Sequence, residues 1–295
     1  MKTQGCEGWE SFPSYLDLVV PRILETLRRS GVRATFFIVG KDAALDKNRE
    51  VLRSIPEAGH EIANHSYLHE PWLHLYSQEE LQRDFDSAET SIYKATGKIP
   101  RGFRGPGFST SPAVRNLLVK RGYIYDASLF PTVLSGLARA YFLKMSKLPD
   151  EEKVRRSKLF GSMSDGVSPL NPYQIQPGLL EIPVTTMPLF RTPMHLSYLL
   201  FLGQFSMPLA HVYWATALYL CRKTGVGPSL LLHPTDFLDA TDVPELSFFP
   251  AMKIPFEKKI NLVRHALSGL RQHWLPGTMM DHAAKSGMDI GNTIL

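Results

Sequence analysis

Between residues 59 and 69 the sequence reads Gly59-His60-Glu61-Ile62-Ala63-Asn64-His65-Ser66-Tyr67-Leu68-His69. We expect a short strand over 60–64, with His65 and His69 on the same side of a helical turn just beyond its end. Neutral imidazoles suit zinc, cobalt and similar divalent ions. The spacing predicts a metal site at these two residues. The alternative is a group of surface histidines or hydrogen-bonded core histidines. Four of the ten histidines crowd this region: His60, His65, His69 and His74.

Short apolar segments alternate with helix-like segments on both sides of this stretch. Upstream, residues 34–39 read as a buried strand after a helix that Pro21 opens and Gly31 closes. Downstream, Ser77-Gln78-Glu79-Glu80 is a capping box that opens a helix to Thr96. The other expected elements are strands at 101–104, 123–126, 179–185 and 229–233 and helices at 43–58, 111–121, 195–222 and 256–273.

This alternation is typical of a parallel α/β sheet or barrel. We predict a single α/β domain over residues 1–295, in which the chemistry lies where the strands end. Residues 130–178 break the rhythm and are interpreted as an irregular insertion or lid. The chain has 295 residues, of which 44% are hydrophobic and 21% charged, so it can bury a full core and is not globally disordered.

Charge and cysteine content limit the partners and the compartment. The net charge is only +5, and the longest basic cluster, at 153–158, has no interleaved aromatics, so nucleic acid is not an expected partner. Two distant cysteines, Cys6 and Cys221, favour a reducing compartment and a cytoplasmic location. Residues 1–10 lack a signal pattern, and no apolar run reaches the ~20 residues of a membrane span.

Two further strand ends carry residues suited to catalysis. Arg104 precedes the rigid turn Gly105-Pro106-Gly107, where a guanidinium can hold a carboxylate in a bidentate pair. His233 ends the apolar segment 229–232, and its ordinary pKa near neutrality suits a general acid or base. The alternatives are a surface arginine and a structural histidine.

Taken in order, these three strand ends resemble the polysaccharide deacetylase family, carbohydrate esterase family 4. The resemblance rests on residues 34–40, on 59–69, on Phe103-Arg104-Gly105-Pro106-Gly107 and on Leu231-Leu232-His233. It implies an incomplete (β/α)7-type barrel, the chitooligosaccharide deacetylase homology domain. It also implies a hydrolase that removes an N-acyl group, acetyl or formyl, from an amino sugar in a polysaccharide or a lipid-linked glycan.

The resemblance also implies roles for individual residues. His65 and His69 would hold a divalent metal, zinc or alternatively cobalt or manganese. His233 would protonate the leaving amine, and Arg104 would orient the catalytic carboxylate. Glu181 lies near the family's fourth motif, and Asp126 and Asp236 are carboxylates near the site; none of the three receives a role.

The family's first motif, an aspartate pair that supplies the base and a metal ligand, has no counterpart in this sequence. The first strand is therefore expected to be missing, which leaves an open sheet edge at 34–39. Three explanations stay open. Met1 is an internal methionine of a longer enzyme, the chain is a non-catalytic carbohydrate-binding pseudoenzyme, or Glu7 or Glu10 substitutes. Loss of the base alone predicts a rate lower by about 10²–10⁴.

The segment 187–222 is rich in aromatic and aliphatic residues. One interpretation is a buried helix pair of the barrel. The other is an interfacial surface that gives peripheral membrane contact through tyrosine and tryptophan. In the second case, this segment and the insertion at 130–178 would frame the entrance for a glycolipid substrate.

Overall fold

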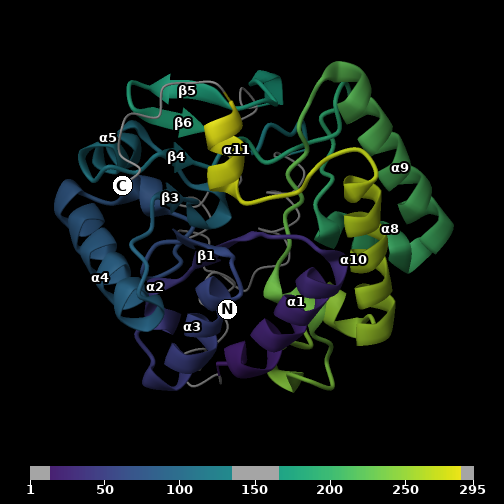
Figure 1. The fold of residues 1–295 in the computed structure, drawn as a ribbon, viewed down its shortest axis with the longest axis horizontal. Coiled ribbons are helices and arrows are strands. Elements are labelled where there is room, and N and C mark those ends of the chain that lie inside the picture. The colour runs from purple at the N-terminus through teal and green to yellow at the C-terminus, as the bar shows by residue number, and fades with distance from the viewer. Residues whose placement is uncertain (1–13, 135–165, 287–295) are drawn as a thin grey trace, which may run out of the picture.

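The computed structural model describes residues 14–134 and 166–286 (Figure 1). The sequence-predicted insertion at 130–178 therefore falls largely outside the described residues. In chain order the helices and strands are α1 (Leu16–Ser30), β1 (Thr35–Ile38), α2 (Gly40–Ala43), α3 (Arg49–Glu57), β2 (Glu61–Asn64), α4 (Gln78–Thr96), β3 (Gly102–Phe103), α5 (Pro112–Lys120), β4 (Tyr125–Asp126), β5 (Tyr173–Gln176), β6 (Leu179–Glu181), α8 (Leu196–Phe205), α9 (Met207–Thr224), α10 (Phe256–Arg271) and α11 (Met279–Lys285).

The six strands form one sheet in the order β1-β2-β3-β4-β6-β5. The neighbours from β1 through β6 run parallel, whereas β5 adds an antiparallel edge. Helices surround the sheet (Figure 1), so the predicted α/β class with a mostly parallel sheet is confirmed. Within the described residues β1 pairs only with β2. The carboxyl ends of β2, β3, β4 and β6 therefore meet at one edge.

Several element boundaries differ from the sequence-based expectation. Helix α1 begins at Leu16 and contains Pro21 in its interior, so this proline does not open it. The expected helix at 43–58 is broken into α2, a short 3-10 turn and α3. The capping box at Ser77 and the left-handed Gly97 bound α4 as predicted, because both signals act locally.

Two expectations in the C-terminal half were wrong. Residues 195–222 form two helices, because the Ser206 side chain accepts the Leu209 N–H and starts α9 anew. Residues 229–233 are extended but form no strand. The hydrogen bonds that their backbone makes to neighbouring segments are isolated. The Leu231 carbonyl accepts the Leu196 N–H, and the Ser229 N–H donates to the Thr185 hydroxyl. A strand requires a ladder of backbone pairs, and no neighbouring strand supplies one among the described residues.

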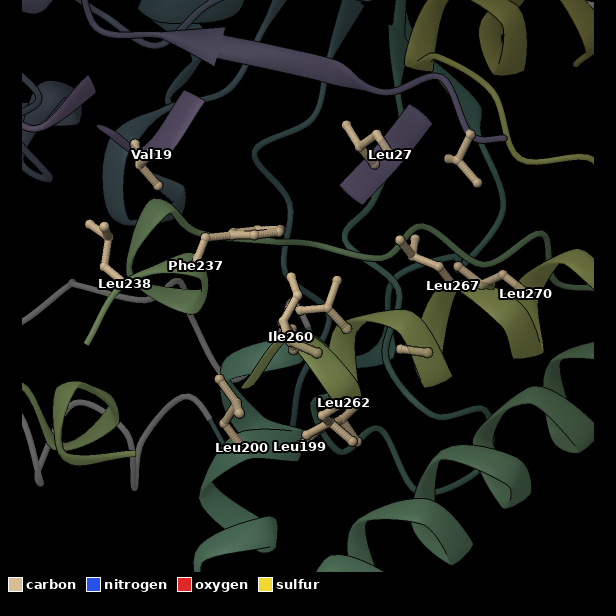
Figure 2. Close-up of a cluster of buried hydrophobic side chains, with 14 of the residues drawn as sticks. Val19, Leu27, Leu199, Leu200, Phe237, Leu238, Ile260, Leu262, Leu267 and Leu270 are labelled. Atoms are coloured by element: carbon tan, nitrogen blue, oxygen red, sulfur yellow. The ribbon is translucent and has the colours of Figure 1, made fainter. Parts of the chain in front are cut away.

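The main hydrophobic core lies between α1, α8, α10 and the turn that follows His233 (Figure 2). Leu199 and Leu200 of α8 are fully buried in it together with Phe237 of that turn. Figure 2 shows these side chains converging with Ile260 and Leu262 of α10. The shared core fixes the start of α8 beside His233, which matters for the site described next.

Candidate active site

The loop that follows β2 carries His65 and His69 and is not a helical turn. Ser66 and His69 have φ angles of 62° and 55°, in the left-handed region that residues other than glycine rarely adopt. The prediction of a helical turn was therefore wrong. Side chains impose this conformation, because the Ser66 hydroxyl accepts the His69 N–H at 3.0 Å and Asn64 Oδ1 accepts the Ser66 N–H at 2.9 Å. Non-glycine strain of this kind is characteristic of functional loops.

A buried carboxylate from α4 supports the same loop. Asp84 is 5% exposed, and its two oxygens accept the N–H groups of Tyr67 at 3.0 Å and Leu68 at 3.3 Å. Burial raises the pKa of Asp84, and the two backbone hydrogen bonds oppose that rise. The segment that presents His65 and His69 is thus anchored by a helix outside the motif.

The two histidine rings converge despite the different backbone. Their centroids lie 4.8 Å apart at an interplanar angle of 64°. His65 Nδ1 lies 2.6 Å from the Arg104 carbonyl oxygen. A carbonyl can only accept, so Nδ1 carries the proton and Nε2 carries the lone pair. Removal from bulk water, and then the neighbouring His69, lower the pKa of His65 well below its ordinary value, so this ring is neutral at pH 7.

Arg104 lies directly beside this pair, because its backbone N–H bonds the Asn64 carbonyl across the sheet. The guanidinium stacks on the Phe37 ring at 4.3 Å, and Nε donates to the Ala127 carbonyl at 2.8 Å. Among the described residues it makes no hydrogen bond to a carboxylate, and its buried Nη2 atom has no partner. Burial lowers the pKa of Arg104 to about 10, and the nearby acidic groups of Tyr125, Glu181 and Asp126 partly oppose this shift.

Asp126 and Glu181 form a buried carboxylate pair behind Arg104. They are register partners on β4 and β6, and both are fully buried. Asp126 accepts hydrogen bonds from the hydroxyls of Ser128 and Thr110. Glu181 accepts only the Leu129 N–H, and its other oxygen has no partner in the described part of the chain. Burial and then the Asp126 charge raise the pKa of Glu181 well above its ordinary value, and burial also raises the pKa of Asp126.

His233 is oriented through a serine. Asp236 Oδ1 accepts the Ser197 hydroxyl proton at 3.2 Å, and Ser197 Oγ lies 3.0 Å from His233 Nδ1. Because the hydroxyl proton is directed to the carboxylate, His233 Nδ1–H donates to Ser197, and Nε2 keeps its lone pair. The other Asp236 oxygen accepts the backbone N–H of His233 at 2.8 Å. Buried Lys259 of α10 holds the same turn by donating to the Thr235 and Leu238 carbonyls.

The environment of His233 keeps its imidazole neutral at pH 7. Desolvation lowers the pKa of His233, Asp236 opposes that shift and Arg104 adds to it. Protonation of His233 would in turn lower the pKa of His65, so these two histidines lie in one electrostatic neighbourhood. Although protein groups surround their imidazoles closely enough to desolvate them, His69 and His233 remain partly exposed, so the site opens to solvent.

The structure thus brings together the four sequence-predicted site residues: His65, His69, Arg104 and His233. It adds Ser197 and His195, the latter with its ring centroid 6.3 Å from that of His233, and it places Asp236, which received no role from the sequence, against Ser197. The strand ends of the sequence do not point to the start of α8, because residues 195–222 read as one continuous helix. A polar His-x-Ser at the beginning of an otherwise apolar segment was the available signal.

Two neutral imidazoles fit a divalent metal in part. His65 has the arrangement typical of a ligating histidine, with Nδ1–H on a backbone carbonyl and a free Nε2. The described residues contain no group of three histidine, cysteine, aspartate or glutamate side chains that could hold a metal ion. His65 and His69 therefore supply at most two ligands, and any further protein ligand comes from outside the described residues.

The family comparison agrees with this geometry. Residues 10–125 match the family model described as polysaccharide deacetylase, a range that includes the His65–His69 loop and Arg104. Over residues 10–125 the chain is therefore similar to the polysaccharide deacetylase family.

Curated relatives are similar to part of the chain. A peptidoglycan deacetylase from Helicobacter pylori is 33% identical over 110 residues, which cover 37% of this chain and 36% of that protein. A peptidoglycan N-acetylglucosamine deacetylase from Listeria monocytogenes is 32% identical over 88 residues, which cover 30% of this chain and 18% of that protein. The chain therefore matches about a third or less of the length of these relatives.

The likeness of fold extends further than the likeness of sequence. A Mycobacterium smegmatis crystal structure, described as a polysaccharide deacetylase, aligns over 92% of this chain and 78% of its own, with a TM-score of 0.58. Its sequence identity is 22%, so this likeness concerns the fold alone.

Proposed function

We propose that this polysaccharide deacetylase relative is a metal-dependent hydrolase that removes an acetyl or formyl group from the nitrogen of an amino sugar. The glycan is a polysaccharide or a lipid-linked glycan. One observation carries the proposal. In both His65 and His233, Nδ1–H donates a hydrogen bond to another group of the protein, and Nε2 is left unprotonated. One ring is thereby prepared to ligate a metal and the other to accept a proton.

The residues would divide the work as follows. His65 and His69 would hold a zinc ion or a similar cation, which supplies polarisation of the acyl carbonyl and a lowered pKa of bound water. His233 Nε2 accepts the proton of the attacking water, and the remaining hydroxide oxygen bonds to the acyl carbon. The carbon–nitrogen bond then breaks, and the same proton passes from His233 to the departing amine. Asp236 and Ser197 hold the His233 ring in the required orientation.

Arg104 acts from behind the histidines in this proposal. Its charge lies close to Asp126 and Glu181 while its carbonyl orients His65. It therefore couples the buried carboxylates to the ligand histidine. Its sequence-based role, orienting a catalytic carboxylate, requires a carboxylate from outside the described residues.

A second candidate function is non-catalytic carbohydrate binding. It is favoured by the lack, within the described residues, of three ligating side chains in one place. A measurement of turnover distinguishes the two candidate functions. The hydrolase predicts acetate release from oligomers of N-acetylglucosamine in the presence of zinc, whereas the pseudoenzyme predicts binding of the oligomer without release.

The test compares wild type with His233→Ala and with His211→Ala as a matched control. His211 stacks on His265 between α9 and α10, with ring centroids 4.1 Å apart, and within the described part of the chain no hydrogen bond or ring contact joins it to the site residues. We expect His233→Ala to lower acetate release by about 10²–10⁴ and His211→Ala to leave it unchanged. Equal turnover in all three proteins would remove His233 from the mechanism.

We also propose peripheral membrane contact through 187–222. No helix in the described part of the chain is long and apolar enough to span a bilayer. Residues 192–221 contain no Asp, Glu, Lys or Arg, yet Phe201, Phe205 and Val212 are 49%, 74% and 63% exposed. Cations lie only at the two ends of this segment, at Arg191, Arg222 and Lys223. An uncharged aromatic face with basic flanks suits the interface of an anionic bilayer.

Vesicle sedimentation tests this contact. Phe205→Ser should reduce binding to vesicles that contain phosphatidylglycerol, whereas the α4 variant Tyr93→Ser, also at an exposed aromatic, should not. Binding that is unaffected by Phe205→Ser would contradict the contact. A cytoplasmic location is likewise a proposal. It is supported by the composition and by Cys221, which is a free, buried thiol.

A further inference from the structure

His195 lies in the site although no strand end or family motif pointed to it. It is the residue immediately before α8, and its ring is half-buried. The ring centroid lies 5.9 Å from that of Phe130 and 6.3 Å from that of His233, which it meets edge-on at 87°. Two residues further along, Ser197 bonds His233. The start of α8 therefore provides both the support of His233 and a second imidazole beside it.

The hydrogen bonding of His195 is the reverse of that of His65 and His233. Its Nδ1 accepts the backbone N–H of Tyr198 at 3.3 Å and thereby caps α8. A neutral imidazole has one N–H, so the proton of His195 is on Nε2. Burial and then the His233 charge lower the pKa of His195 to about 3, so the ring stays neutral throughout the working pH range.

The Nε2–H group of His195 has no hydrogen-bond partner in the described ranges 14–134 and 166–286. It is nevertheless held in place, because the cap at Nδ1 and the packing against Phe130 fix the ring. His65 and His233 offer lone pairs at Nε2, so His195 offers the complementary group, a neutral donor. The same tautomer excludes His195 as a metal ligand unless α8 loses its cap.

We propose that His195 is a substrate-binding residue whose Nε2–H donates to a hydroxyl oxygen of the amino sugar. A neutral donor matches an uncharged hydroxyl. Aromatic rings continue on either side, with Phe108 4.7 Å from Phe130 and Tyr198 6.3 Å from His195 between centroids. Apolar ring faces next to a fixed neutral donor suit the mixed polar and apolar surface of a sugar. The proposal rests on the proposed function for the identity of the ligand, but not for turnover.

The experiment separates the donor from the helix cap. Asparagine is a preferred N-cap residue, so His195→Asn retains an oxygen for the Tyr198 N–H but removes the Nε2–H group. His195→Ala removes both. Binding of an oligomer of N-acetylglucosamine is measured by calorimetry for wild type and both variants, and thermal unfolding is recorded alongside.

We expect His195→Asn to unfold like wild type and to bind the oligomer roughly fivefold more weakly, the equivalent of one neutral hydrogen bond. His195→Ala should bind as weakly as His195→Asn and also unfold at a lower temperature. Wild-type affinity in His195→Asn, or no binding by wild type, would overturn the proposal. Binding without acetate release would instead count against the hydrolase while leaving the role of His195 intact.

Discussion

Replacing Asp84 by alanine tests whether α4 holds the histidine loop in its strained conformation. The substitution leaves the N–H groups of Tyr67 and Leu68 without their acceptor. Each unsatisfied buried group costs about 1–3 kcal/mol. Part of this loss of stability is offset, because the substitution also removes a buried carboxylate whose desolvation is unfavourable and raises its pKa. We expect a net loss of about 2–4 kcal/mol in the free energy of unfolding.

The matched control is Asp86→Ala on the same helix. Asp86 is largely exposed and pairs with Arg121 at 2.7 Å on the surface, where a salt bridge contributes about 0–1 kcal/mol. Thermal unfolding should show Asp84→Ala lower by on the order of 5–15 °C, at about 2–4 °C per kcal/mol. Asp86→Ala should stay within a few degrees of wild type. Equal melting temperatures for the two variants would refute the proposed anchoring of the loop.

Two further predictions concern the carboxylates behind and beside the site. The raised pKa of Glu181 means that its stabilising contribution is complete below the pKa of an unfolded carboxyl group, near pH 4, and is lost as the pH rises toward the folded value. The free energy of unfolding of Glu181→Gln, measured by denaturant titration, should therefore depend less on pH than that of wild type between pH 5 and 8. An unchanged pH dependence would show that Glu181 is ionised in the folded wild type. Ser197→Ala disconnects His233 from Asp236. It should lower acetate release by about 10–100-fold while zinc content stays constant, and a variant with full turnover would exclude orientation through the serine.

Local signals in the sequence were sufficient where the structure depends on neighbours in the chain. Ser77 and Gly97 bound α4 as expected, because a capping box and a left-handed glycine act within a few residues. The meeting of His65 and Arg104 followed from the parallel pairing of β2 and β3, whose carboxyl ends share one edge. The prediction that His65 is a metal ligand came from the sequence, whereas its tautomer follows from the structure.

The remaining features depend on contacts between distant segments. The conformation of the 65–69 loop is set by Asp84, and nothing near the histidines indicates that α4 supplies its support. Asp126 and Glu181 become partners only through the register of β4 and β6, although they lie far apart in the sequence. His195 lies next to His233 because α8 packs on the core that also holds the turn after His233 (Figure 2). The spacing of residues in the sequence does not indicate which distant segments come into contact.

The central claim is that His65 and His69 form the metal-binding part of this site. Equilibrium dialysis of the full chain against zinc, followed by elemental analysis, tests it most directly. We predict about one zinc per chain for wild type and for His211→Ala, and loss of this zinc in both His65→Ala and His69→Ala. A wild-type chain without zinc, or histidine variants that retain the wild-type stoichiometry, would contradict the claim.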